Sequence, residues 1–319
     1  MKLSNTTLQK LIKGACYFEI KGGYLYSYRY SKKQIEHMSR EGYDAYWLNR
    51  ALICGPQRIE FKTDATEISF DYKASETHIN ANTVDLYVDD ILCQVYHIED
   101  KLKGHISFTL KEGVKKVSIY LPCESTLCIK GFEINGNYKS IKTKGDKVLI
   151  IGDSITQGAG PSIASLAYAS GLSRNLGYNV IAQGIGGYRF EPDDIMSVDG
   201  FDPDKIIIAM GTNWYDSEIY DYEKNAREFY KKISEVFSGK PVLVITPLWR
   251  GNADKWERFL WCIDIIKDAC RSYESFTVVD GFGLIPNTND CFSDKIHPNA
   301  FGSIELANNL TKVIKEIKF

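Results

Sequence analysis

The chain has 319 residues, which exceeds the usual size of a single hydrophobic core, so we expect two domains. Apolar residues make up 44% of the chain, charged residues make up 25%, and the net charge at pH 7 is -2. This composition is typical of a globular protein and lacks the basic surplus that favours polyanions, so we expect neither nucleic acid nor a membrane as a partner.

The N-terminal stretch and the cysteines bear on the cellular compartment. Residues 1–14, MKLSNTTLQKLIKG, contain no apolar run long enough for a signal peptide, and no run of about 18 apolar residues occurs elsewhere, so we expect a cytoplasmic protein. The eight cysteines are scattered without a C-x-x-C pair, and Cys123 and Cys128 lie far from any histidine cluster. We interpret the cysteines as small buried hydrophobes and expect no metal site.

Alternating apolar residues between positions 58 and 135 predict an antiparallel sandwich. The alternating segments are RIEF, EISFDY, VDLYV, HISFTL and KVSIYL. We expect turns at Asp89-Asp90 and at Glu112-Gly113. The tyrosine-rich segment GGYLYSYRY, nearer the N-terminus, fits either a strand or a loop. A polar, lysine-rich link, YKSIKTKGDK, follows the sandwich, and we place the domain boundary near residue 140.

After this link the pattern changes to short apolar runs that alternate with helical segments. The runs are VLII, NVIA, KIIIAM, VLVIT and TVVD. Apolar residues recur at intervals of three and four in the segments Tyr222 to Phe237, Asp254 to Tyr273 and Ala300 to Lys318, which we predict as helices. Parallel strands that alternate with helices predict an α/β, flavodoxin-like three-layer domain over residues 141–319, after a β-sandwich over residues 1–140.

The stretch VLIIGDSITQGAG, residues 148–160, ends a predicted buried strand on Gly-Asp-Ser. A parallel strand that stops at a small polar residue brings that residue to the carboxyl edge of the sheet, where ligands bind in open α/β sheets. Ser154 is therefore a candidate nucleophile, although a tight strand-to-helix turn could also require a small residue here. Asp153 is better suited to holding this turn through backbone N–H groups than to acting on substrate.

A serine hydroxyl is a poor nucleophile until a base takes its proton. Of the five histidines, only His297, in SDKIHPN, lies beyond residue 140, so it is the base if the second domain works alone. Asp294, three residues earlier, can accept a hydrogen bond from Nδ1–H of His297 and fix its tautomer. The other histidines lack metal-ligand spacing, and we expect surface or packing roles for them; they are His37, His78, His97 and His105.

Acyl transfer also requires hydrogen-bond donors for the oxyanion of the tetrahedral intermediate. The run NVIA ends in QGIGGYRF, where glycines allow close approach to the backbone and Gly187 can present its N–H. The run KIIIAM ends in GTNWYD, where Asn213 can present its side-chain amide. The glycines do not form a dinucleotide motif, because Arg189 stands where G-x-G-x-x-G requires its last glycine, and we expect no cofactor.

The segments GDSIT, GIGG, GTN and DKIHP lie within residues 148–298, in the order and at the strand ends of the four signature blocks of SGNH hydrolases, also called GDSL esterases. The second domain therefore resembles this family. The chain departs from the family pattern at Ala182-Gln183-Gly184, where an Asn usually precedes the glycine turn. It departs again at Trp214, since the third block usually reads GxND.

The resemblance assigns a role to each residue that matches the family motifs. It implies that Ser154 is the nucleophile and, through its N–H, the first oxyanion donor. Gly187 and Asn213 would be the second and third donors. His297 would be the base, and Asp294 the acid that orients it. These roles agree with those inferred from the residues themselves.

A jelly-roll-like sandwich before an SGNH domain is similar to the arrangement in carbohydrate esterases that remove O-acetyl groups, and to that in GDSL-type acyltransferases of natural-product pathways. Several aromatic and cationic residues follow the predicted strands and could form a rim on which a sugar ring stacks, although aromatic residues are also ordinary packing material. These residues are Tyr188, Arg189, Trp214, Tyr215, Trp249 and Arg250.

We therefore expect a serine esterase that removes short acyl groups, with acetyl as the expected group, from carbohydrate esters through an acyl-enzyme intermediate. The expected partner is a small-molecule or oligosaccharide ester. The rim, the sandwich and the lack of a long apolar stretch suited to a lipid tail favour this substrate. Two alternatives are an acyltransferase that passes the acyl group to an alcohol or sugar in a water-poor pocket, and an inactive carbohydrate-binding protein. The intact set of Ser154, Asp294 and His297 favours an enzyme.

Overall fold

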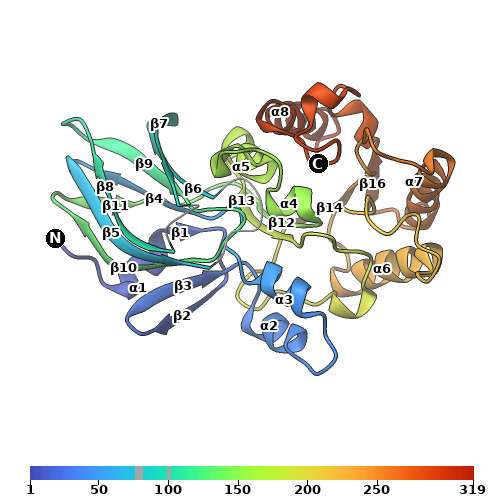
Figure 1. Cartoon of the computed structure of the whole chain (residues 1–319), viewed down its shortest axis with the longest axis horizontal. Helices are drawn as coiled ribbons and strands as arrows, with labels where there is room; N and C mark the ends of the chain where they lie inside the picture. Colours follow the sequence, from blue (N-terminus) through green and yellow to red (C-terminus); the bar gives the residue numbers. More distant parts are fainter. Residues whose placement is uncertain (76–81, 99–101) are drawn as a thin grey trace.

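The computed structural model describes residues 1–75, 82–98 and 102–319, so His78 lies outside the described residues. Antiparallel strands form a sandwich at one end of the molecule, and a parallel sheet flanked by helices forms the other end (Figure 1). Both architectures confirm the predicted fold class. We call residues 1–140 the front region and residues 141–319 the rear region; β11 ends at Ser140 and β12 begins at Lys147.

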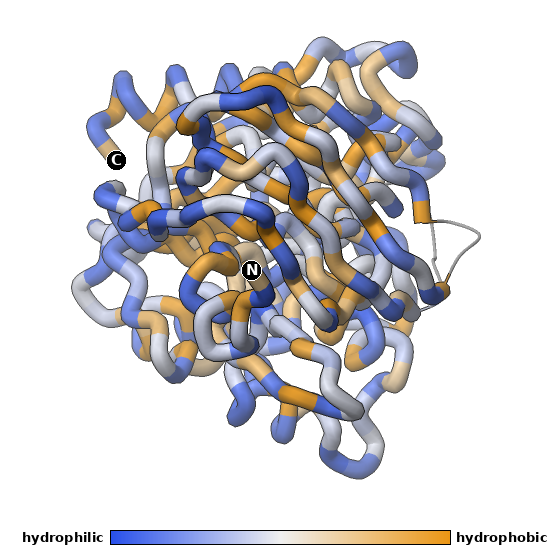
Figure 2. Tube along the Cα trace, turned by 90° about the vertical axis from the view of Figure 1, so that its left-hand side faces the viewer, coloured by the Kyte–Doolittle hydropathy of each residue, from blue (hydrophilic) through white to orange (hydrophobic). Residues whose placement is uncertain are grey.

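Two antiparallel sheets make up the sandwich of the front region. One has the strand order β1-β4-β9-β6-β7, with β11 also paired to β4, and the other has the order β2-β3-β10-β5-β8. Apolar side chains from both sheets meet in one core, and the alternation of apolar and polar residues along the strands is visible in Figure 2. The strands are β1 (Ile12–Lys13), β2 (Tyr17–Lys21), β3 (Tyr24–Tyr28), β4 (Arg58–Thr63), β5 (Glu67–Ala74), β6 (Thr83–Val88), β7 (Ile91–His97), β8 (Lys103–Thr109), β9 (Lys115–Tyr120), β10 (Leu127–Ile134) and β11 (Tyr138–Ser140).

The turns of the sandwich lie where the sequence predicts them. Asp89 and Asp90 connect β6 to β7 with φ values of 49° and 67°, which suits a two-residue hairpin loop. Glu112-Gly113 lies between β8 and β9. The segment GGYLYSYRY, which fitted either a strand or a loop, forms β3, and β3 pairs with β2 across the turn at Gly22-Gly23.

The rear region has a parallel sheet in the order β13-β12-β14-β15-β16, which is the strand order of flavodoxin-like folds. Alternate strand residues face opposite layers: Leu149 and Ile151 share a core with α6 and α7, whereas Val148 and Ile150 share one with α5 and α8. The elements are β12 (Lys147–Gly152), α4 (Ser154–Gln157), α5 (Tyr168–Leu176), β13 (Asn179–Gly184), β14 (Lys205–Ala209), α6 (Tyr222–Val236), β15 (Val242–Ile245), α7 (Trp256–Cys270), β16 (Phe276–Val279) and α8 (Ala300–Glu316).

The front region also contains helices that the sequence analysis did not predict: α1 (Asn5–Leu11), α2 (Lys32–Met38) and α3 (Ala45–Ala51). Helices α2 and α3 lie beside the rear region (Figure 1). Met38, Trp47 and Ala51 belong to the same hydrophobic core as the strands of the parallel sheet. The chain segment between β3 and β4 is therefore part of the packing of the rear region.

The guanidinium of Arg29, which is fully buried, joins the two regions. Its Nη1 donates to the carbonyl oxygens of Ala182 (2.9 Å) and Gly184 (2.8 Å), both on β13, the outer strand of the parallel sheet. Its Nε donates to the Ile53 carbonyl (3.1 Å), and its Nη2 donates to the Arg50 carbonyl (2.8 Å). Buried carbonyl groups require such partners, so Arg29 satisfies the outer edge of β13, which pairs with no further strand among the described residues.

The eight cysteines form no disulfide; Cys93 is exposed, Cys16 is half-buried and the other six are buried. The expectation of small buried hydrophobes therefore holds for most of them but not for Cys93. Across residues 1–75, 82–98 and 102–319, no group of three or more His, Cys, Asp or Glu side chains is placed to hold a metal ion. Within the same ranges, no helix combines the length and the apolar character needed to cross a bilayer.

We expect Arg29→Met to lower the free energy of unfolding by roughly 3 kcal/mol or more, because four buried carbonyl groups lose a charged donor. Urea unfolding of the variant and the wild type measures this loss. The matched control is Arg271→Met, whose side chain is 80% exposed, and it should leave stability nearly unchanged. Equal effects of the two substitutions would contradict a bridging role for Arg29.

Candidate active site

The site begins where β12 ends at Gly152 and the chain turns into α4. Asp153 caps this helix, because its Oδ1 accepts a hydrogen bond from the Ile155 N–H (3.0 Å), as the sequence analysis expected. Ser154 is the first residue of α4, where backbone N–H groups have no acceptor within the helix. At the end of the neighbouring strand, a β-carbon on Gly184 would lie 2.2 Å from the Gln157 nitrogen, so glycine is required for this close approach.

Ser154, His297 and Asp294 form one chain of hydrogen bonds. The Ser154 hydroxyl lies 2.7 Å from His297 Nε2, and His297 Nδ1 lies 2.6 Å from Asp294 Oδ2. With the imidazole neutral, Nδ1–H donates to the carboxylate and Nε2 accepts from the hydroxyl. The arrangement can therefore take the proton of the Ser154 hydroxyl and stabilise the imidazolium that results.

The loop that carries His297 is held from several sides. Asp294 Oδ1 accepts from the N–H groups of His297 (2.8 Å) and Ile296 (3.0 Å), so one carboxylate shapes the loop and also orients the ring. Gly160 supports the loop with φ of 113°, and a β-carbon there would lie 2.3 Å from the Pro298 carbonyl oxygen and 2.9 Å from His297 Cβ. The position of the imidazole therefore depends on a glycine at 160.

The two carboxyl groups of the site titrate in opposite directions. Burial by itself raises the pKa of Asp294, but the hydrogen bonds from the His297 N–H and ring outweigh burial, so its pKa is lowered. Burial raises the pKa of Asp153 to about 6, against the hydrogen bond from Ile155 and the charges of His297 and Arg250. Asp294 is thus held ionised beside the imidazole, whereas Asp153 stays protonated up to about pH 6.

The glycine loop, residues 184–188, follows β13 and leaves one N–H group open. The Gly186 N–H donates to Gln157 Oε1 (2.8 Å), and the Gly187 carbonyl accepts from Trp214 Nε1 (3.1 Å). Gly187 has φ of 72°, and no acceptor for its N–H occurs within the described part of the chain. Side chains thus fix the peptide groups around Gly187, and its N–H is free for a ligand.

Asn213 reaches the same loop from the end of β14. Its Nδ2 donates one hydrogen to the Tyr188 carbonyl (3.1 Å), which leaves the second hydrogen of the amide for another acceptor. Trp214 and Gln183, which lie where the chain departs from the family pattern, also make hydrogen bonds in this part of the structure. Trp214, with φ of 62°, binds Gly187 as described, and Gln183 Nε2 donates to the Arg29 carbonyl (2.9 Å).

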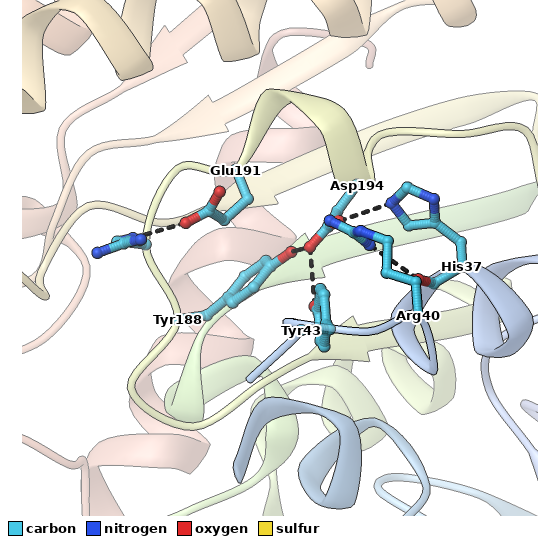
Figure 3. A network of polar contacts seen from close by, with 7 residues as sticks. His37, Arg40, Tyr43, Tyr188, Glu191 and Asp194 are labelled. Atoms are coloured by element: carbon cyan, nitrogen blue, oxygen red, sulfur yellow. Dashed lines mark hydrogen bonds and ion pairs between the residues drawn. The ribbon is translucent and has the colours of Figure 1, made fainter. Parts of the chain in front are cut away.

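A buried carboxylate that the sequence analysis missed ties the glycine loop to the front region (Figure 3). Asp194 Oδ2 accepts from the hydroxyls of Tyr188 (2.5 Å) and Tyr43 (2.8 Å), and its Oδ1 lies 2.9 Å from His37 Nε2 and 3.5 Å from Arg40. The side chain of Asp194 is only 7% exposed. His37 therefore has a contact in the rear region, which helps to hold α2 beside the loop.

Of the predicted rim residues that follow β13 and β14, Tyr188 is buried, whereas Arg189 and Trp214 are partly exposed. Tyr188 is 5% exposed, with its ring edge-to-face on Trp47 at 5.0 Å, so it offers no free ring face at the surface. The guanidinium of Arg189 lies over the rings of Trp47 (5.2 Å) and Trp214 (4.4 Å) and pairs with Glu191 at 2.6 Å. The stacked guanidinium of Arg189 thus covers part of the Trp214 ring, and both side chains keep some exposed surface.

The other predicted rim residues lie after β14 and β15. Tyr215 is 5% exposed and lies under the guanidinium of Arg250, at 5.2 Å. Arg250 Nη1 donates to the Thr212 carbonyl (2.7 Å), next to Asn213. Trp249 packs on Phe292 at 5.6 Å, and both Trp249 and Arg250 remain partly exposed. Trp249 and Arg250 therefore keep accessible surface, as Arg189 and Trp214 do.

Tyr46, on α3 of the front region, is an aromatic neighbour of the glycine loop that sequence reasoning missed. It is 49% exposed, and its ring lies 3.6 Å from the position of a β-carbon on Gly187. The guanidinium of Arg50 covers its ring at 4.8 Å. The sequence does contain a signal for the helix that carries Tyr46, because Asp44 stands before an apolar run as helix N-caps do. In the structure, Asp44 Oδ1 caps α3 by accepting a hydrogen bond from the Tyr46 N–H.

The remaining histidines lie apart from Ser154. His105 Nδ1 contacts Asp71 Oδ1 at 2.8 Å on the exposed surface of the sandwich, which confirms the surface role expected for it. His97 ends β7. Among the residues described, His297 is the histidine within hydrogen-bond reach of Ser154.

Comparisons with known proteins agree with this architecture. Residues 150–303 match the profile of the GDSL-like Lipase/Acylhydrolase family. The salicylyl-acyltransferase SsfX3 from a tetracycline biosynthetic pathway has a similar fold, with a TM-score of 0.74 and 18% identity over 96% of this chain and 94% of that one. A Bacteroides ovatus protein described as a GDSL-like lipase aligns with a TM-score of 0.79 and 19% identity over 100% and 98% of the two chains.

A family two carbohydrate esterase from Clostridium thermocellum, solved in complex with cellohexaose, aligns with a TM-score of 0.66 and 16% identity over 93% of this chain and 99% of that one. At sequence identities of 16% to 19%, these similarities show a shared fold. No curated protein sequence matches the chain.

We expect the free energy of unfolding of Asp153→Asn to increase relative to that of the wild type as the pH rises. Between about pH 4 and pH 6 the unfolded wild type has lost the proton that the folded wild type keeps on Asp153, so its free energy of unfolding falls as the pH rises through this window, by about 3 kcal/mol. Asparagine can still cap α4 and does not titrate. Urea unfolding at both ends of the window measures the difference between variant and wild type.

The control for this titration is Asp264→Asn, an exposed carboxylate on α7 whose side chain is 77% exposed. Its difference from the wild type should stay nearly constant over the same pH range. A pH-independent difference for Asp153→Asn as well would contradict the raised pKa.

Proposed function

Because residues 150–303 belong to the GDSL-like lipase/acylhydrolase family, we propose that this chain is a serine esterase that removes short acyl groups, with acetyl as the first candidate, from carbohydrate esters. One observation carries the proposal. Ser154 Oγ, His297 and the Asp294 carboxylate are joined by hydrogen bonds of 2.7 and 2.6 Å at the carboxyl edge of the parallel sheet.

The reaction begins with proton transfer from Ser154 Oγ to His297 Nε2 while Oγ attacks the carbonyl carbon of the ester. The carbonyl oxygen becomes an oxyanion, and we assign the N–H groups of Ser154 and Gly187 and the Nδ2 of Asn213 as its donors. When the bond to the leaving alkoxy group breaks, His297 returns the proton to that oxygen, so the alcohol departs and an acyl group remains on Ser154.

Water completes the cycle. His297 takes a proton from a water molecule as its oxygen attacks the acyl carbon, and the same oxyanion donors stabilise the second intermediate. The bond to Ser154 Oγ then breaks, Oγ regains the proton from His297, and the free acid leaves. Asp294 remains ionised throughout and holds Nδ1–H, in line with its lowered pKa.

Exposed side chains around the site support a carbohydrate as the alcohol part of the ester. Tyr46, Trp249 and Arg250 offer partly exposed aromatic and cationic surface suited to a sugar. The fold shared with a carbohydrate esterase solved with cellohexaose agrees with this choice.

An acyltransferase is the second candidate, and the likeness in fold to the salicylyl-acyltransferase SsfX3 favours it. The same acyl-enzyme would form, but an alcohol rather than water would attack it. The two candidates therefore differ only in the second half of the reaction, and a product analysis separates them.

We expect Ser154→Ala to lower kcat on 4-nitrophenyl acetate by roughly 10³-fold or more, because the nucleophile is removed. The wild type should also release acetate from acetylated xylo- or manno-oligosaccharides. The control is Ser170→Ala, a buried serine of α5 whose hydroxyl has no partner in the described structure, and its activity should equal that of the wild type. Wild-type activity retained in Ser154→Ala would refute the assignment of the nucleophile.

When a sugar or a small alcohol is added as an acceptor, we expect the acetate released to equal the ester consumed, because water is the proposed acceptor. Chromatography of the products with and without the acceptor measures both quantities. Acylated acceptor as the main product would establish the acyltransferase instead.

A further inference from the structure

A buried ion pair of the front region contacts the glycine loop through a single side chain. Glu124 lies between β9 and β10 and is fully buried. Its Oε2 accepts from Arg50 Nη1 at 2.8 Å, and its Oε1 accepts from Gln157 Nε2 at 2.6 Å. The Oε1 of Gln157 then accepts the Gly186 N–H at 2.8 Å. Three contacts thus lead from α3 to the residue that precedes Gly187.

The charge on Glu124 determines which way the amide of Gln157 points. An ionised carboxylate only accepts hydrogen bonds, so Gln157 must turn its NH₂ group toward Glu124 and its oxygen toward the Gly186 N–H. With the amide reversed, its oxygen would face a carboxylate and its NH₂ group would face an N–H. Both contacts would be repulsive, so a single orientation of the Gln157 amide is allowed.

Both oxygens of Glu124 accept hydrogen bonds, one from the charged guanidinium of Arg50 and one from the amide of Gln157. Burial raises the pKa of Glu124, and these two partners offset only part of the rise. A buried ion pair is an inefficient source of stability, because its desolvation offsets much of its attraction. The pair is therefore better explained by the orientation that it gives to Gln157 than by stability alone.

We propose that Glu124 and Arg50 are positioning residues for the oxyanion donor of Gly187 and that they act through Gln157. The inference rests on the proposed function, in which the Gly187 N–H stabilises the oxyanion. The Gly186 peptide is fixed by Gln157, and the orientation of that peptide sets the direction of the next N–H along the chain. Through Glu124 and Arg50, the front region thus supplies part of the geometry of the oxyanion site, and neither of these two residues need touch the substrate.

The test is Glu124→Gln. With Arg50 donating to its oxygen, the new amide turns its NH₂ group toward Gln157, which must reverse and present its own NH₂ group to the Gly186 N–H. We expect kcat on 4-nitrophenyl acetate to fall about 10- to 100-fold, less than the loss of a whole donor, with KM changed less than about threefold. A kcat equal to that of the wild type would overturn the proposal.

The matched control is Glu60→Gln, which weakens another buried Arg–Glu pair of the sandwich. Glu60 is 5% exposed, and Arg58 Nε lies 3.0 Å from its Oε2. Both substitutions should lower stability, but Glu60→Gln should leave kcat unchanged. A comparable fall in kcat for the two variants would assign the effect of Glu124→Gln to general destabilisation and overturn the proposal.

The double variant Glu124→Gln/Gln157→Glu restores the pattern of donors and acceptors. The carboxylate at 157 accepts from Gly186 and from the new amide at 124, and that amide accepts from Arg50, with total charge unchanged. We expect its kcat to exceed that of Glu124→Gln by about fivefold or more. A double variant no more active than Glu124→Gln would count against the proposal.

An NMR measurement keeps this inference separate from the proposed function. In ¹⁵N-glycine-labelled protein, the Gly186 amide proton should move upfield in Glu124→Gln, where it loses its acceptor, and should stay in place in Glu60→Gln. If the wild type hydrolysed no ester, the proposed function would fail, but this shift would still show whether Glu124 positions the loop. An unchanged Gly186 signal would overturn the inference whatever the activity.

Discussion

The interaction on which the site depends is the hydrogen bonding of Arg29 to the outer edge of β13. The Ala182 and Gly184 carbonyls stand at the end of this strand, where the chain enters the glycine loop, and both are bound by one buried guanidinium. Arg29 also holds the Arg50 carbonyl and so brings α3 to the same place. The loop therefore starts from an edge that the front region has fixed.

The parts of the site that lie close together in sequence were predictable. Asp294 and His297 are three residues apart, and a loop that short leaves few ways to arrange them. The strand ends were predictable as well, because buried parallel strands appear as apolar runs and the polar residues after them meet at one sheet edge. Ser154 and Asn213 were found by this rule.

The supporting contacts were not predictable, because they join residues that are far apart in the chain. Arg50 and Glu124 are separated by 74 residues, and His37 and Asp194 by 157. No periodicity connects such pairs. The burial of an aromatic residue was not predictable either. Tyr188 was expected at a sugar-binding rim, but its hydroxyl donates to the buried carboxylate of Asp194. This hydrogen bond allows the ring to lie in the core.

The open edge of β13 also has a consequence for biosynthesis. A ribosome delivers the N-terminal part of a chain first, and domains generally fold as they emerge. The strands of the sandwich and Arg29 are therefore synthesised before residues 179–184 leave the ribosome, so Arg29 can bind the β13 carbonyls as soon as that strand forms. In the order in which this chain is made, the side chain that binds the β13 carbonyls is thus synthesised before the strand that it covers.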